Sequence, residues 1–397
     1  MRATSTFKKS FKSKESFKKS LITAAVAAAV ALSSGFASAA SDQPTLTEPV
    51  KAGNWSASLN RTEGGNYDIN VFDQLVTGAG ERTLNVEKSF SQTDFEAVKA
   101  LDGFGEFGNY YDDDDINPYQ VGMVDGVFIN GADTDVTFNN ASVVVTGGTL
   151  DGNPYVEIGG VYHREGAAEY TGASTNIHVS SAAAVDADEE AWVTGTLSII
   201  RSGFAKTQRR VTFSADKTDI AAESTNENGL DVIAFAVSTD AVDNPAVTFA
   251  RGETTITAST ANDDMWAYAL YMHNSDNNDG SGSVTVAEGA TLNLVATGGN
   301  PTGLYIDHGT FTSNGTLIVR ATTDSQVGSP SGIVAAGNAE LTFNGKTEVY
   351  TQGDYAEALF VNSDYAGTVA ASATFGSKSE TTLNGSVAVG MKLPRQA

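Results

Sequence analysis

The sequence contains no cysteine among its 397 residues. Disulfide bonds are therefore excluded, although an exported chain of this size could use them. Two explanations stay open. Either the core is large enough to be stable without cross-links, or the chain has to stay unfolded while it crosses a second membrane.

Proline is also scarce, with 8 residues against 40 glycines, which favours many turns. After residue 45, runs rich in Val, Thr, Ile, Phe and Tyr alternate with Gly, Asn, Asp and Ser. This alternation is typical of strands joined by tight turns. The sequence therefore predicts an all-β protein and disfavours a bundle of long helices.

Long apolar runs are missing as well. The apolar run Leu21–Leu32 has 12 residues, whereas a transmembrane helix needs roughly 20. It follows the basic segment MRATSTFKKSFKSKESFKKS and precedes the small residues Ala37-Ser38-Ala39, as in a secretory signal peptide. We expect residues 1–39 to be a cleaved signal peptide, with Ala40 as the alternative last residue. An uncleaved or amphipathic anchor is the alternative interpretation.

Basic residues are few outside this leader. The chain has 24 Lys and Arg against 48 Asp and Glu, and the leader holds seven basic residues and one acid. The rest carries 24 − 7 = 17 basic and 48 − 1 = 47 acidic residues, a net charge near −30. We expect nucleic acid and anionic lipid to be repelled. The acidity keeps an exported chain soluble but identifies no partner.

A short phrase recurs along the chain: a small residue, then an apolar, a variable and an apolar residue, then a polar turn. In TGLYIDHG, 302–309, the period of two predicts that Gly303 makes a turn, that Leu304 and Ile306 face the core, and that Tyr305 faces outward. Each copy is followed by a second strand-like phrase, often VTF. The copies of the first phrase are GVFING (126–131), GVYHREG (160–166), the weaker GTLSIIRSG (195–203), AFAVST (234–239), ALYMHN (269–274), GLYIDHG (303–309), GIVAAGN (332–338) and ALFVNS (358–363).

Eight such pairs predict a right-handed parallel β-helix over residues 121–390. The starting residues of the copies given above are spaced as in the repeats of solenoid proteins. One coil buries too little apolar surface to offset its conformational entropy, so coils have to stack. Residues 40–120 lack the repeat and are the predicted N-terminal cap, with a short helix at 93–101 whose Thr93 and Glu96 have capping-box spacing. The tail 391–397 shows no cap, and we expect a missing C-terminal part.

The basic leader, the repeated phrases, the VTF phrases, the acidity and the lack of cysteine resemble the passenger region of a Gram-negative autotransporter, with its pertactin-like β-helix and type V secretion. The resemblance implies export to the cell surface or release. The family anchors its passenger with a C-terminal outer-membrane β-barrel, for which residues 364–397 leave no room. We therefore expect this chain to have no barrel, and a periplasmic location if the barrel is truly absent.

Asp307 and His308 form the first candidate site, because an acid precedes a histidine. They align with turn residues in the other copies, so we expect them to lie in a turn. The residues that match Asp307 in the neighbouring copies are His273 and Ala336, so no second acid supports hydrolysis by paired carboxylates. The serines of GSGSVT, 280–285, are interpreted as loop residues rather than a catalytic serine.

Two further features of the sequence could bind a ligand. The acidic run Asp112–Asp115 could hold calcium through clustered oxygens, but a solvated loop is the simpler interpretation. Aromatic residues share the outward slot of several copies, and they could meet a sugar or protein surface or merely stack on one another. Tyr271, Tyr305 and Phe360 are the candidate surface-binding aromatics.

The sequence therefore predicts a non-enzymatic, exported β-helix that acts in adhesion or surface interaction with a host-surface protein or glycan. No cofactor, metal ion or nucleic acid is expected. The alternative is a carbohydrate-active β-helix enzyme, a polysaccharide lyase or hydrolase.

Overall fold

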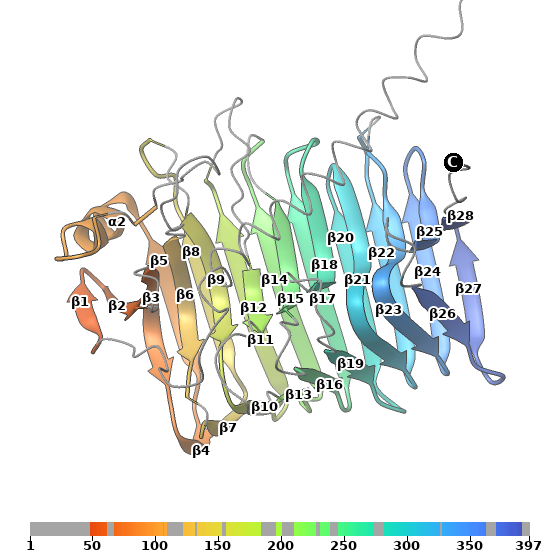
Figure 1. Ribbon diagram of the computed structural model, residues 1–397, viewed down its shortest axis with the longest axis horizontal. Helices are drawn as coiled ribbons and strands as arrows, with labels where there is room; N and C mark the ends of the chain where they lie inside the picture. The colour runs from red at the N-terminus through yellow and green to blue at the C-terminus, as the bar shows by residue number, and fades with distance from the viewer. Residues whose placement is uncertain are drawn as a thin grey trace, which may run out of the picture.

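The chain folds as a parallel β-helix, which confirms the predicted all-β fold class. Figure 1 shows its coils stacked along the long axis, from β3 (Tyr67–Val76) beside helix α2 (Gln92–Lys99) to β27 (Glu380–Asn384) and β28 (Ser386–Gly390). The computed structural model describes residues 48–61, 67–105, 107–108, 122–131, 133–152, 156–183, 196–200, 210–227, 231–238, 245–273, 282–325, 328–362 and 371–390.

Each coil contributes to three parallel sheets, because the predicted second phrase contains two strands separated by a corner. The first sheet consists of β3, β6 (Gly122–Ile129), β9 (Val156–His163), β12 (Thr196–Ile200), β15 (Val232–Ser238), β18 (Trp266–His273), the first part of β21 (Asn300–Ser313), the first part of β23 (Ser331–Phe343), β25 (Glu357–Asn362) and β28. The second consists of β4 (Ala79–Arg82), β7 (Asp135–Asn139), β10 (Ala167–Thr171), β13 (Arg210–Phe213), β16 (Ala246–Phe249), β19 (Ser283–Val286), the remaining parts of β21 and β23, and β26 (Ser372–Phe375).

The third sheet has nine strands. They are β5 (Asn85–Phe90), β8 (Ser142–Gly147), β11 (Ser174–Ser181), β14 (Lys217–Ser224), β17 (Glu253–Thr260), β20 (Thr291–Thr297), β22 (Thr316–Thr322), β24 (Lys346–Gln352) and β27. Gly252 lies at the corner between β16 and β17, where it has φ +72°. A left-handed φ of this kind favours glycine.

The VTF phrase recurs because it forms the second sheet. Its Val and Phe side chains point into the core and its Thr points outward, as Val211, Thr212 and Phe213 illustrate. The inward rings stack from coil to coil, with centroids 5.0 Å apart between Tyr170 and Phe213 and 5.4 Å apart between Phe213 and Phe249. Such same-face contacts between paired strands stabilise a sheet beyond the burial of the rings.

The small residue of the first phrase lies inside a strand rather than in a turn, which corrects the prediction for Gly303. This glycine is an interior residue of β21, and a Cβ atom there would lie 2.2 Å from Cγ1 of Val319 on β22. Glycine is required because the first and third sheets approach each other closely at this point. Leu304 and Ile306 are fully buried in the core, as predicted.

The β-helix begins earlier than the predicted residue 121. Strands β3, β4 and β5 already pair in parallel with β6, β7 and β8, so they form a first coil. The repeated phrase is not recognisable in this coil because Asp73 lies opposite Gly126, the small residue with which the phrase begins in the next coil. In addition, Gly80 and Arg82 stand opposite Val136 and Phe138 of the first VTF phrase.

The N-terminal end of the stack is covered by a hairpin and a helix. The strands β1 (Val50–Ala52) and β2 (Trp55–Arg61) pair antiparallel with each other, and β2 pairs antiparallel with β3. Helix α2 buries Phe95 and Val98 in the same core. The predicted helix is confirmed, but its capping box is Ser91 with Asp94 rather than Thr93 with Glu96, because the helix starts one residue earlier.

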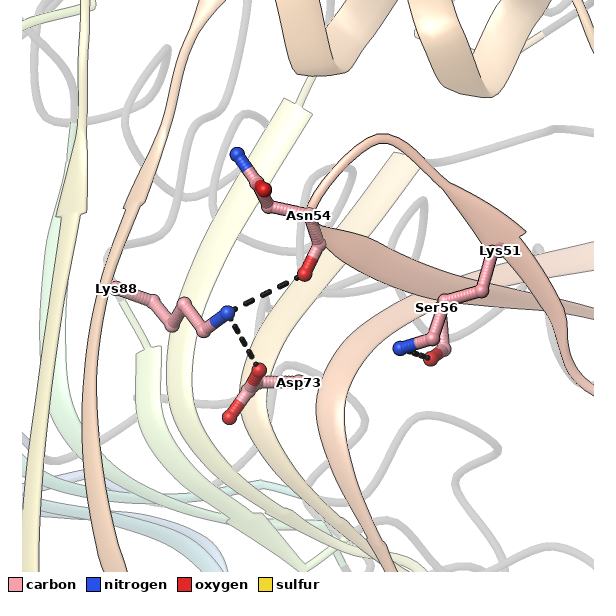
Figure 2. Close-up of polar contacts among 5 residues, drawn as sticks. All are labelled: Lys51, Asn54, Ser56, Asp73 and Lys88. Carbon is pink, nitrogen blue, oxygen red and sulfur yellow. Dashed lines mark hydrogen bonds and ion pairs between the residues drawn. The ribbon is translucent and has the colours of Figure 1, made fainter.

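A lysine of the first coil ties the hairpin to the stack (Figure 2). Nζ of Lys88 lies 2.9 Å from Oδ1 of Asp73 and donates to the carbonyl oxygen of Asn54 at 3.3 Å. On the hairpin itself, Lys51 donates to Oγ of Ser56 at 3.0 Å. Asp73 and Lys88 stand at the positions that Gly126 and Val145 occupy in the next coil, where these two residues lie close together. The first coil is therefore polar at this point, whereas the next coil is apolar.

Three predictions fall on residues that the structure does not describe. These are the signal peptide with its cleavage after Ala39 or Ala40, the acidic run Asp112–Asp115 and the tail 391–397. Within the described residues, none of the helices has the length and apolar character needed to cross a bilayer.

Candidate functional site

The candidate aromatic residues share one register position on the outer face of the first sheet, as predicted. Tyr271 pairs with Tyr305, and Val334 separates Tyr305 from Phe360. The rings of Tyr271 and Tyr305 are stacked, with centroids 5.1 Å apart and planes inclined by 22°. The same row contains Phe128 and Tyr162.

Most side chains in this outward-facing row are buried. Tyr271 is 6% exposed and Tyr162 is 4% exposed, while Phe128 is fully buried. Tyr305 and Phe360 are half-buried. Of the three predicted surface-binding aromatics, only Tyr305 and Phe360 therefore offer an appreciable part of their side chains to a ligand.

Strand β18 carries two more aromatic residues beside Tyr271. The rings of Trp266 and Tyr268 stack at 6.2 Å, and Tyr268 meets Tyr271 at 5.1 Å and Tyr305 edge-on at 5.9 Å. Tyr268 is buried, and its hydroxyl has no hydrogen-bond partner among the described residues. Burial raises the pKa of this hydroxyl well above the usual value. These rings form a rigid support for Tyr305, because aromatic pairs add stabilisation beyond their buried area.

The carboxylate of Asp307 joins two histidines on neighbouring coils. Oδ2 of Asp307 lies 3.0 Å from Nδ1 of His273, at hydrogen-bond distance, and 3.4 Å from Nδ1 of His308. Burial raises the pKa of the Asp307 carboxyl, but the two imidazoles outweigh this effect and hold its pKa well below the usual range. Asp307 is therefore ionised at neutral pH.

The predicted turn at Asp307 and His308 is wrong. Both residues lie within strand β21, at a β-bulge where the register with β23 shifts between Ile306 and His308. The corner comes at Gly309, whose φ is +97°. A bulge commonly re-aims a side chain, and this one lies where the Asp307 carboxylate meets His273 of the preceding coil.

Glycine on the following coil leaves room for this contact. Gly337 has φ +55°, and a Cβ atom there would lie 2.4 Å from the carbonyl oxygen of Asp307 and 2.8 Å from Cε1 of His308. Only a residue without a side chain fits beside Asp307 and His308 at this position.

We name Tyr305, His273, Asp307 and His308 the Tyr305 patch. The three charged or titratable side chains of the patch retain between 11% and 20% exposure.

Asp231, a second perturbed carboxyl group, lies at the opposite end of strand β18. Its Oδ1 accepts a hydrogen bond of 2.6 Å from the backbone N–H of Trp266. Burial raises the pKa of Asp231 to about 7, against the opposing effect of this hydrogen bond. Trp266 and His273 are seven residues apart on one strand, or roughly 20 Å at about 3.3 Å per residue. Asp231 and Asp307 are thus too far apart to be the catalytic pair of a glycoside hydrolase, in which the two carboxyl groups lie about 5–10 Å apart.

The sequence interpretation missed buried charged residues on the outer face of β6 and β9. Asp125 is 4% exposed and Glu157 is 2% exposed, and each takes part in further interactions. Their only signal in the sequence is an acid within an apolar strand. His163, whose register partners are Ile129 and Ile200, is also buried, whereas His178 lies exposed on the third sheet.

Neither a metal site nor a serine nucleophile emerges from the described residues. In them, no group of three or more His, Asp or Glu side chains is arranged to hold a metal ion. The loop prediction is wrong for Ser283, which starts strand β19 and pairs in register with Thr310, whereas Ser281 lies outside the described residues. No protein-family model, curated protein sequence or solved structure matches the chain.

Proposed function

We propose that this protein is an exported, non-enzymatic β-helix that acts in adhesion or surface interaction, as its resemblance to autotransporter passengers implies. The observation that carries the proposal is the Tyr305 patch. It combines a supported aromatic ring with an ionised carboxylate and two imidazoles on the outer face of a long, repetitive scaffold.

The chemistry of the patch suits a sugar or a polar protein surface. The half-buried ring of Tyr305 offers an apolar face, and the carboxylate of Asp307 accepts hydrogen bonds from hydroxyl or amide groups. Because Tyr305 stacks on Tyr271, its ring loses little further freedom when a ligand binds. A host-surface glycan or protein is the partner class that we propose, at the cell surface or in secreted form.

One observation favours the enzymatic alternative. The contact between Asp307 and His273 resembles the acid–histidine half of a catalytic triad, in which the carboxylate orients the imidazole. A carbohydrate-active enzyme therefore remains the second candidate, without a placed nucleophile or a paired carboxylate.

The test exposes the purified chain to arrays of glycans and host-surface proteins, and in parallel to acidic and neutral polysaccharides as substrates. The adhesion proposal expects saturable binding without cleavage. Polysaccharide cleavage that is abolished in both Asp307→Asn and His308→Ala would instead establish the enzyme. A chain that neither binds nor cleaves any member of the panels would contradict both.

A further inference from the structure

The outward-facing aromatic row of the first sheet is interrupted at one coil. Tyr305 of β21 pairs with Val334 of β23, and Val334 pairs with Phe360 of β25. Val334 lies outside the core cluster, which contains its strand neighbours Ile333 and Ala335. A short aliphatic side chain, 8% exposed, therefore stands on the outer face between two longer aromatic side chains that are half-buried.

The interruption has the size of one ring. Where tyrosines occupy adjacent coils of this row, as Tyr271 and Tyr305 do, the ring centroids are 5.1 Å apart. Tyr305 and Phe360 are two coils apart, which corresponds to about 10 Å at about 4.8 Å per coil. A ring that a ligand places above Val334 would therefore stack on both aromatic side chains, at about half that distance from each.

Hydrogen-bonding groups stand on both sides of this position. The carboxylate of Asp307 reaches over the strand of Val334, because a Cβ atom at Gly337 would lie 2.7 Å from its Oδ1. Oδ2 of Asp307 contacts the two histidines, whereas Oδ1 has no hydrogen-bond partner among the described residues. In the other direction along β23 lies Ser331, which pairs in register with Glu357 of the next coil.

We propose that a neutral sugar binds here, with its pyranose ring above Val334 and between the rings of Tyr305 and Phe360. The faces of a pyranose ring carry C–H groups, which pack against aromatic rings. Its hydroxyl groups lie around the rim, where they can donate to Oδ1 of Asp307 and to the carboxyl group of Glu357. The inference rests on the proposed function and deepens it, because it selects a glycan rather than a protein as the partner.

Two other classes of ligand suit this position less well. A phenylalanine ring of a protein partner could stack in the same place, but it would cover the Asp307 carboxylate without donating a hydrogen bond, which is unfavourable. An acidic sugar would bring a negative charge close to Asp307 and Glu357, on a chain whose formal net charge is −24. The position therefore favours a ring with several hydroxyl donors and no acid group.

The test measures binding of defined sugars to the purified chain by titration calorimetry. The probes are tetrasaccharides of glucose, galactose, mannose or N-acetylglucosamine, each with its sulfated form. Val334→Phe fills the interrupted position with a ring of the chain itself. We expect it to lower the affinity for the bound neutral tetrasaccharide by about tenfold or more and to keep or raise stability, because it completes the stack. Val334→Ala leaves the position open and should retain binding.

Two further variants separate this position from the rest of the surface. Val295→Phe makes the same change on the outer face of the third sheet, where the register partners are Thr257 and Arg320, and it should leave binding unchanged. Phe360→Ala removes the ring on the far side of Val334 and should weaken binding roughly two- to tenfold, the worth of one stacked aromatic contact. Urea unfolding establishes that each variant is folded.

Failure of this inference is distinguishable from failure of the proposed function. If Val334→Phe binds the tetrasaccharide as tightly as the parent chain while Tyr305→Ala has lost affinity, the inference is overturned and the proposed function stands. The same conclusion follows if the chain binds only host-surface proteins or prefers the sulfated sugars. If Val334→Phe is unfolded, unchanged affinity of Phe360→Ala overturns the inference. A chain that binds neither these sugars nor any member of the panels would overturn both.

Discussion

Replacing Asp231 with asparagine is expected to stabilise the protein at neutral and alkaline pH. The Asp231 carboxyl is buried and its pKa is raised to about 7 from 3.8. A raised pKa means that folding favours the protonated acid. The stability contribution is fully present below about pH 3.8 and is lost as the pH rises through about 7. Asparagine removes this loss and still offers Oδ1 to the backbone N–H of Trp266.

The magnitude follows from the shift of the pKa. A difference of about 3 units at roughly 1.4 kcal/mol per unit gives an upper limit of about 4 kcal/mol above pH 7. The assay is urea unfolding of the parent chain and Asp231→Asn at several pH values from about 4 to about 8. Asp151→Asn, at an exposed carboxyl group, is the control for the change in formal charge. An advantage of Asp231→Asn that is independent of pH, or largest in acid, would refute the reasoning.

Three further substitutions test the packing around the candidate site. Asp307→Ala should cost about 1–3 kcal/mol at pH 7, because it removes a charged acceptor shared by His273 and His308. The lowered pKa of Asp307 makes this difference fade in urea unfolding below about pH 3.8, and a cost that persists in strong acid would contradict it. Gly337→Ala should lower the thermal midpoint more than Gly289→Ala. Both glycines have positive φ, but a Cβ atom at Gly289 meets nothing within 4 Å, so equal losses would argue against crowding at Asp307. Gly303→Ala should destabilise by about 1–3 kcal/mol through its clash with Val319, and unchanged chemical denaturation would contradict this contact.

The fold was predictable because its signal is local and repeated. Alternation along Leu304, Tyr305 and Ile306 sets which side chains face the core, and the VTF phrase marks a strand in nearly every coil. The first coil escaped detection because Asp73 and Gly80 replace the residues that define the phrases. Its strands are specified by pairing with the next coil rather than by their own pattern.

The candidate site was only partly predictable. The shared outward slot of Tyr271 and Tyr305 follows from the repeat, and so does the alignment of His273 with Asp307. Their contact depends on a bulge in β21, which no residue pattern near Asp307 marks. The burial of Tyr271 and Asp231 could not be foreseen either. Tyr271 packs against Tyr268 and Tyr305, and Asp231 accepts a hydrogen bond from the backbone of Trp266, and the repeat encodes neither arrangement.

The most direct test of the proposed function is the affinity of the purified chain for the surface ligand that it captures in the panels, compared between two matched variants. Tyr305→Ala removes the aromatic ring of the patch, whereas Tyr350→Ala removes a 40% exposed tyrosine from strand β24 of the third sheet. Stacked aromatic contacts are worth about 0.5–1.5 kcal/mol beyond buried area, so we predict at least a several-fold loss of affinity for Tyr305→Ala and none for Tyr350→Ala. Unchanged binding by Tyr305→Ala, or an equal loss in both variants, would contradict the assignment of the binding site to the first sheet.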